Sequence, residues 1–90
     1  MKLKLYMNLR DIVGKDELEM DLENPVSLTE LLREISRTYG DKMSKFLLKE
    51  TNEIADSLII TMNDEVVKTH EPVFITNKDE VSILLPLAGG

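Results

Sequence analysis

The sequence predicts an α+β fold in which a mixed β-sheet is covered on one face by a helix. Three observations predict it: apolar and polar residues alternate near the N-terminus, a long segment of helical periodicity follows, and short segments rich in β-branched residues fill the second half. Hydrophobic residues make up 42% and charged residues 31% of the 90 residues, a balance typical of one globular domain.

The first two predicted elements are strands. Apolar residues alternate with polar ones over residues 2–9, as in a strand that buries one face. Gly14 begins a Gly-Lys-Asp turn, and a second alternation follows over residues 17–23. We expect the two strands to pair as an N-terminal hairpin. Their core-facing residues would be Leu3, Leu5, Met7 and Leu9 on the first strand, and Leu18, Met20 and Leu22 on the second.

A helix is predicted next. Ser27 and Glu30 have the spacing of a capping box, in which each side chain satisfies a backbone N–H of the other residue. The helical pattern runs to Tyr39, and Gly40 suits the left-handed conformation that ends many helices. A second, short helix is predicted over residues 41–50. The face of the first helix that should lie on the sheet carries Leu28, Leu31, Leu32 and Ile35.

The second half of the chain predicts further strands. Residues 58–62 are apolar and β-branched and end at an Asn-Asp turn, so they predict a central strand. Shorter segments at 66–67 and 73–75 precede the last predicted strand at 81–85. A hairpin, a helix and further strands, in this order, form the layout of the β-grasp fold. A ferredoxin-like fold would need a second crossover helix, and residues 41–50 follow the first helix with no strand between.

Pro86 marks the predicted end of the domain. Because proline has no N–H, it cannot extend the strand ladder, so we expect a β-grasp domain over residues 1–85 and a flexible tail over residues 86–90. Gly89 and Gly90 lack Cβ atoms, which lets the tail enter a narrow channel and present its carboxylate to a phosphate or a nucleophile. Three apolar residues are expected to form a partner anchor beside the tail: Phe74, Leu85 and Leu87.

The predicted domain offers no candidate active site of its own. There is no cysteine, which excludes disulfides, thiolate metal sites and thiol nucleophiles. The single histidine, His70, lies in a predicted loop with no partner to position it for acid or base catalysis. The carboxylates of residues 16–23 line one face of a strand, whereas a metal site needs converging ligands. We therefore expect no metal, no bound cofactor and no catalysis by this chain.

The charge and hydropathy of the chain limit its partners. A net charge of −6 and a pI of about 4.7 disfavour nucleic acid, whose binding depends on neutralising phosphates, and favour basic proteins. No apolar stretch approaches the roughly 18 residues that span a bilayer, and the N-terminus has no continuous apolar segment typical of an export signal. We expect a cytoplasmic protein that does not bind membranes.

Several segments carry a resemblance to a known family. They are LKLY from residue 3, VGK from residue 13, VSLTELL from residue 26, MNDEVV from residue 62, DEVSILLP from residue 79, and the final Ala88-Gly89-Gly90. On these segments the chain resembles the MoaD and ThiS family of ubiquitin-like sulfur carriers. The resemblance implies that Gly90 is adenylated by an E1-like adenylyltransferase at the expense of ATP and is then converted to a thiocarboxylate. It further implies that Gly89 admits the tail to partner active sites and that Pro86 marks the boundary between the last strand and the tail. We expect Pro86, Leu87 and Ala88 to contact partners.

The departures from the family pattern bear on the pathway. Carriers similar to molybdopterin synthase small subunits commonly have phenylalanine where Tyr6 stands, glycine where Lys78 stands and proline where Leu85 stands. The segment between Gly40 and Leu58 is longer than in the shortest thiazole-pathway carriers. The length and the Pro-x-Ala-Gly-Gly end favour the molybdopterin branch, in which the thiocarboxylate donates sulfur inside a larger, MoaE-like subunit.

Other functions fit the same sequence. A ubiquitin-like modifier would join Gly90 to lysines of target proteins through isopeptide bonds, and a sulfur carrier could serve thiamine thiazole synthesis or tRNA thiolation. A plain interaction module with an incidental tail would be unaffected by loss of Gly90.

Overall fold

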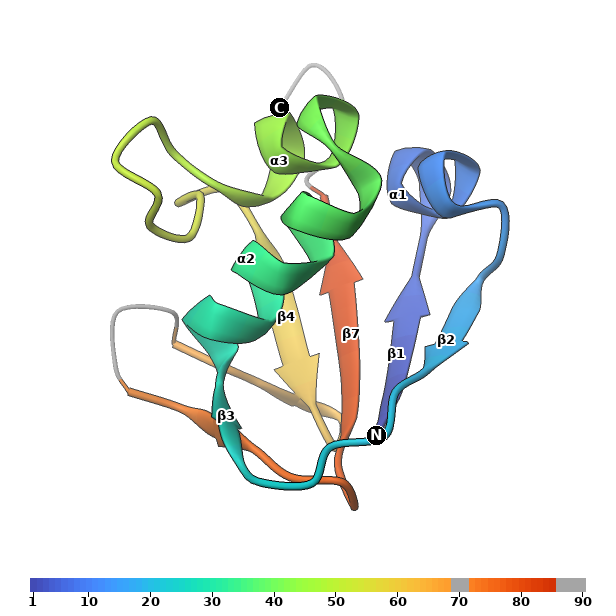
Figure 1. The fold of residues 1–90 in the computed structure, drawn as a ribbon, viewed down its shortest axis with the longest axis vertical. Coiled ribbons are helices and arrows are strands. Elements are labelled where there is room, and N and C mark those ends of the chain that lie inside the picture. The colour runs from blue at the N-terminus through green and yellow to red at the C-terminus, as the bar shows by residue number, and fades with distance from the viewer. Residues whose placement is uncertain (69–71, 86–90) are drawn as a thin grey trace.

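Five strands form one mixed sheet with helices on one of its faces in the computed structural model, which describes residues 1–68 and 72–85 (Figure 1). In chain order the elements are β1 (Lys2–Leu5), α1 (Met7–Val13), β2 (Glu17–Glu19), β3 (Val26–Ser27), α2 (Leu28–Tyr39), α3 (Asp41–Leu47), β4 (Ile59–Met62), β5 (Glu65–Val66), β6 (Phe74–Ile75) and β7 (Glu80–Leu84).

The strand order β2-β1-β7-β4-β5 confirms the β-grasp prediction. β7 lies at the centre, parallel to β1 and antiparallel to β4. Because parallel strands end at the same edge of a sheet, β1 and β7 both end at the edge that is uppermost in Figure 1. β3 and β6 form a separate two-stranded sheet at the other end of the molecule.

The core lies between α2 and the sheet. Leu32 on α2 is fully buried, as are Leu3 on β1 and Ile83 on β7, and Ile60 on β4 is 1% exposed. The helix period and the strand alternation each leave one apolar face, and burying the two faces against each other removes both from water. The predicted contacts between α2 and the sheet are confirmed, with Leu18 and Met20 only partly buried at the margin of the core.

The first strand is shorter than predicted, because α1 follows it. Met7, expected in the core, is 58% exposed, whereas Leu9 is fully buried. Leu9, Ile12 and Val13 have the i, i+3, i+4 spacing of a helical stripe and pack together against the core. The alternation of Leu5, Met7 and Leu9 therefore concealed a change from strand to helix.

α1 also replaces the predicted tight hairpin. Gly14 ends the helix with a left-handed φ of 85°, and its N–H donates to the Arg10 carbonyl at 2.7 Å. β1 and β2 pair antiparallel as expected, with Leu3 opposite Leu18, but a helical connection joins them. β2 is limited to Glu17–Glu19, and beyond it Met20 and Leu22 still pack against the core outside any strand.

α2 begins and ends at the predicted residues. The Ser27 hydroxyl accepts a hydrogen bond from the Glu30 N–H at 3.1 Å, which is half of the expected capping box. The Glu30 carboxylate does not complete it and instead pairs with Arg37 at 3.1 Å. Gly40 has φ 84° and ψ −164°, a conformation that favours glycine but is not the predicted left-handed one. The second helix, α3, is confirmed over seven residues, Asp41–Leu47.

Two turns are joined at the end of the sheet where β7 begins. The Asp79 carboxylate accepts hydrogen bonds from the Thr76 N–H at 2.7 Å and from the Asn63 side-chain amide at 2.9 Å. The Asn63 side-chain oxygen in turn accepts from the Glu80 N–H at 3.0 Å. The bond from the Thr76 backbone is the main cause that lowers the pKa of Asp79, followed by the bond from Asn63.

We expect Asp79→Ala to lower the free energy of unfolding by about 1 kcal/mol at neutral pH, since it removes the acceptor of these bonds. The lowered pKa means that the stabilisation is present above the ordinary carboxyl pKa and is lost as the pH falls through the lowered value. Urea unfolding from neutral to acidic pH should therefore show a gap between variant and parent that closes in acid. Glu23→Ala removes an exposed carboxylate and should leave the curve unchanged; a gap that persists in acid would contradict this role of Asp79.

Within residues 1–68 and 72–85, no helix has both the length and the apolar character that crossing a membrane requires.

Candidate functional site

The two predicted site residues that the structure describes lie at different ends of the molecule. Leu85 directly follows β7 and packs, partly buried, against the core. Phe74 lies on β6 opposite Ser27, so its pairing with β3 holds it at the start of α2, far from the edge where β7 ends (Figure 1). The structure thus does not bring Phe74 and Leu85 together, contrary to the expectation of one shared anchor. Phe74 is 62% exposed.

The remaining predicted site residues lie outside the described residues. They are Pro86, Leu87, Ala88, Gly89 and Gly90. His70, for which the sequence predicted a solvated side chain, also lies outside the described residues.

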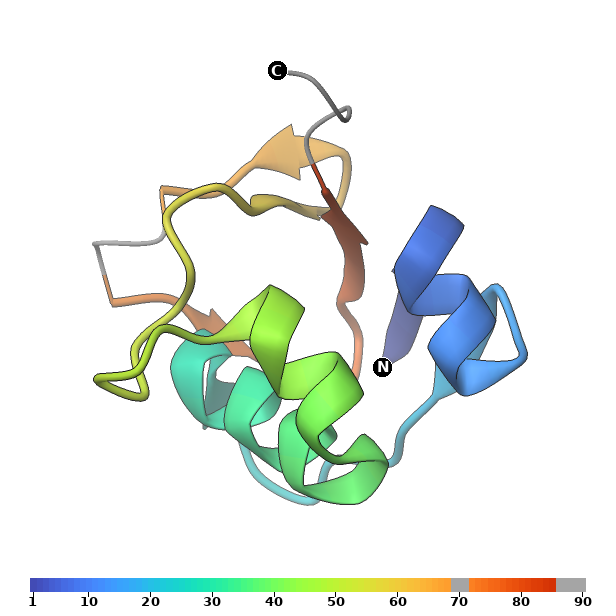
Figure 2. The same cartoon turned by 90° about the horizontal axis from the view of Figure 1, so that it is seen from above.

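α2 and α3 lie on one face of the sheet and leave the other face uncovered (Figure 2). This uncovered face carries apolar side chains near the end of β7. Ile59 lies directly opposite Leu84 in the register of β4 and β7 and is 44% exposed. Val66 lies opposite Thr61, which shares the face of Ile59 because it is two residues along the strand. We call Tyr6, Ile59, Val66 and Leu84 the open-face patch.

Tyr6 belongs to the open-face patch because its backbone continues the strand. Its φ of −130° and ψ of 152° are extended, so its side chain follows the alternation of Lys2 and Lys4 on the uncovered face. Leu5 lies opposite Ile83, which places Tyr6 level with Leu84. Tyr6 is 40% exposed. The patch therefore extends to both sides of the last residue of β7.

The other half of the uncovered face is charged. Lys4 on β1 and Glu80 on β7 form an ion pair with Nζ and Oε1 2.6 Å apart, and Lys2 and Glu17 form a longer one at 3.9 Å. The hydrogen bond between Lys4 and Glu80 raises the pKa of the lysine and lowers the pKa of the glutamate. Both side chains are solvent-accessible, so the pair contributes little to stability. The two ion pairs lie toward the end of the sheet where β7 begins, whereas the open-face patch lies toward the end where β7 ends.

Part of the open-face patch could have been predicted from the sequence, but a continuous apolar run does not show which of its residues faces solvent. Leu58, Ile59 and Ile60 are consecutive, and strand alternation requires that one face receives Ile59 alone. The structure buries Leu58 and Ile60 and exposes Ile59. Val66 was predicted as part of a short partner strand, but which side it faces depends on the register with β4, which the sequence does not encode locally.

Comparisons with known proteins agree with this geometry. The ThiS family model matches residues 3–90. The chain is 24% identical over 90 residues to the molybdopterin synthase sulfur carrier subunit of Dictyostelium discoideum, covering 99% of this chain and 94% of that protein.

Solved structures share the fold. The crystal structure of SAMP1 from Haloferax volcanii, 19% identical, superposes with a TM-score of 0.78 and covers 100% of this chain and 98% of its own. The solution structure of the small archaeal modifier protein 1 from Methanosarcina acetivorans is 26% identical, with a TM-score of 0.72 and coverages of 99% and 94%. The chain belongs to the ThiS family of ubiquitin-like, β-grasp sulfur carriers, whose small members are generally non-catalytic and work with partner enzymes.

Proposed function

We propose that this chain carries sulfur on the carboxyl carbon of Gly90 for the synthesis of molybdopterin. The observation that supports the proposal best is that the family match runs through residue 90, so it includes the Gly89-Gly90 end that the carrier chemistry requires. The name of the Dictyostelium relative, and the near-complete coverage of both chains, favour the molybdopterin branch over other sulfur pathways.

The proposed chemistry takes place on partner enzymes. A carboxylate oxygen of Gly90 attacks the α-phosphorus of ATP on an E1-like adenylyltransferase, and pyrophosphate leaves. Hydrosulfide, or a donor that delivers sulfur at that oxidation level, then attacks the carbonyl carbon and displaces AMP, which leaves a thiocarboxylate on Gly90. In a larger, MoaE-like subunit the thiocarboxylate sulfur attacks the sulfur-free pterin precursor. Water then cleaves the resulting thioester, so the sulfur stays in the dithiolene and Gly90 returns to the carboxylate. The chain itself binds no cofactor in this scheme, and the reactions are placed in the cytoplasm, where ATP is available.

The open-face patch is the proposed docking surface for these partners. It flanks the residue at which β7 ends, so a protein that covers the patch also receives the residues that follow Leu85. Exposed aromatic and branched aliphatic side chains supply the apolar contact that such an interface needs, and the neighbouring Lys4–Glu80 pair supplies a polar rim.

We expect Ile59→Thr to raise the KM for adenylation about tenfold, the effect of losing one well-packed interface side chain. Threonine keeps the β-branch, so thermal unfolding should change little. Phe74→Ser is the matched control, because it removes an exposed apolar side chain at the other end of the molecule and should leave KM unchanged. Equal KM values for the parent and the Ile59→Thr variant would show that partners do not use the patch.

A protein modifier is the second candidate, favoured by the 26% identity to a small archaeal modifier protein. The same adenylate would then react with a lysine amine of a target protein and form an isopeptide bond. The two functions differ in what leaves the activating enzyme: a free chain with a terminal thiocarboxylate, or a chain linked to another protein.

Transfer to the larger subunit tests the molybdopterin proposal. The thiocarboxylate form of the chain, mixed with the MoaE-like subunit and the sulfur-free pterin precursor, should return to the carboxylate form while dithiolene appears. A chain that keeps its sulfur under these conditions, or that is recovered from cell extracts chiefly as lysine-linked conjugates, would reject this pathway in favour of another recipient or of the modifier function.

A further inference from the structure

A groove between α1 and α3 lies outside the open-face patch. The two helices pack against each other, and the groove between them has a volume of about 280 Å³. Its lining comes half from each helix: Asn8, Asp11 and Ile12 from α1, and Lys42, Lys45 and Phe46 from α3.

The rim of the groove is cationic on a protein of net charge −6. Lys42 and Lys45 are exposed and three residues apart, so they lie on one face of α3. Neither forms an ion pair within residues 1–68 and 72–85, whereas Lys49, just beyond the helix, pairs with Asp56 at 2.9 Å. Asp11 is the carboxylate in the lining, and it pairs with Arg10 at 3.9 Å.

The floor of the groove is apolar. Ile12 and Phe46 pack, partly buried, against the core and keep part of their surface exposed to solvent. A ligand that complements this groove therefore combines carboxylates, which meet the two lysines, with an apolar side chain, which covers the floor.

The groove opens at the end of the molecule where β7 ends. α1 follows β1 after one residue, and β1 runs parallel to β7, so α1 and its groove lie at the same end as Leu85 (Figure 1). A protein that engages the residues after Leu85 comes within reach of the groove.

We propose that the α1–α3 groove is a second docking surface, which binds an acidic and apolar segment of the enzyme that activates the C-terminus. The inference rests on the proposed function, since it takes that enzyme as the partner. The lysine rim speeds association through its charge, and the Ile12 and Phe46 floor holds the segment once it has docked.

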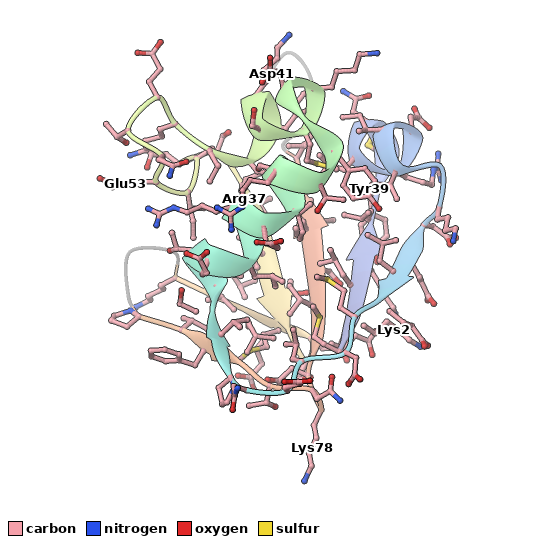
Figure 3. All side chains as sticks on the ribbon, in the orientation of Figure 1. Lys2, Arg37, Tyr39, Asp41, Glu53 and Lys78 are labelled. Carbon is pink, nitrogen blue, oxygen red and sulfur yellow. The ribbon has the colours of Figure 1, made fainter. Side chains whose placement is uncertain are left out.

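The test uses the E1-like adenylyltransferase of the same organism, ATP and the full chain. Lys42→Glu with Lys45→Glu should raise KM about tenfold or more, with kcat unchanged, because two attractive charges become repulsive ones. Lys2→Glu with Lys78→Glu changes the net charge equally and lies away from the groove, because both lysines line a hollow at the end of the sheet where β1 and β7 begin. Lys78 projects from the end opposite to Asp41, the first residue of α3 (Figure 3). This control should keep the parent KM.

The outcomes separate the inference from the proposed function. If the parent chain is not adenylated at all, the proposed function fails. If the parent is adenylated and both double variants match it, or both weaken equally, the groove is not a docking surface. The isolated chain can also be truncated after Leu85 and compared with the full chain by NMR. If the amide shifts of Lys42 and Lys45 change on truncation, the groove is occupied by the chain's own C-terminal segment. That result would overturn the proposal that a segment of the partner enzyme binds there.

Discussion

A chain that ends at Gly89 is expected to unfold at the same temperature as the full chain and to lose adenylation by about 100-fold or more. One extended residue spans about 3.3 to 3.6 Å, and a displacement of even about 1 Å from the reactive geometry can cost about 100-fold in rate. Within residues 1–68 and 72–85 the buried core is formed by residues between Met1 and Ile83, and we expect the residues after Leu85 to add nothing to it.

Two measurements on the shortened chain check this expectation. Thermal unfolding controls for the fold, and ATP–pyrophosphate exchange on the E1-like enzyme reports adenylation. The shortened chain should still compete with the full chain for the enzyme, because the open-face patch is intact. Normal adenylation of the chain that ends at Gly89 would contradict this expectation, because it would show that the enzyme does not need the carboxylate to be on residue 90.

Leu32→Ala is expected to lower the free energy of unfolding by about 2 to 5 kcal/mol. Leu32 is fully buried between α2 and the sheet, so the substitution removes apolar surface from the core and leaves a cavity. Chemical denaturation measures the loss. Glu34→Ala, on the exposed side of α2, should change stability by no more than about 0.5 kcal/mol. A loss below about 1 kcal/mol for Leu32→Ala would contradict the packing of α2 on the sheet.

Local chemistry explains why most of the fold could be predicted. The Ser27 cap and the glycine at position 40 fix the ends of α2, and strand alternation identifies the buried face of β7. α1 could not be predicted in the same way, because the segment fits both periods. Leu5, Met7 and Leu9 have the spacing of a strand, and Leu9, Ile12 and Val13 have the spacing of a helix. The helix forms because it lets Leu9, Ile12 and Val13 pack together against the core, and that packing depends on the tertiary structure.

The candidate site was predicted less well than the fold, for a related reason. The C-terminal residues carry a recognisable chemical pattern, whereas a docking surface is assembled from strands that are distant in the sequence. Ile59, Val66 and Tyr6 come to lie on one face of the sheet only through the registers of β4 with β7, β4 with β5 and β1 with β7. Phe74 was assigned to the wrong end of the molecule because nothing in the sequence near it specifies pairing with β3.

The transfer of sulfur to Gly90 can be followed by the intact mass of the chain after reaction with the E1-like enzyme, ATP and a sulfur donor. We expect a mass gain equal to the exchange of one oxygen for one sulfur, found in the C-terminal peptide and absent without ATP. An unchanged mass, in a reaction where pyrophosphate release shows that the enzyme has activated the chain, would contradict it.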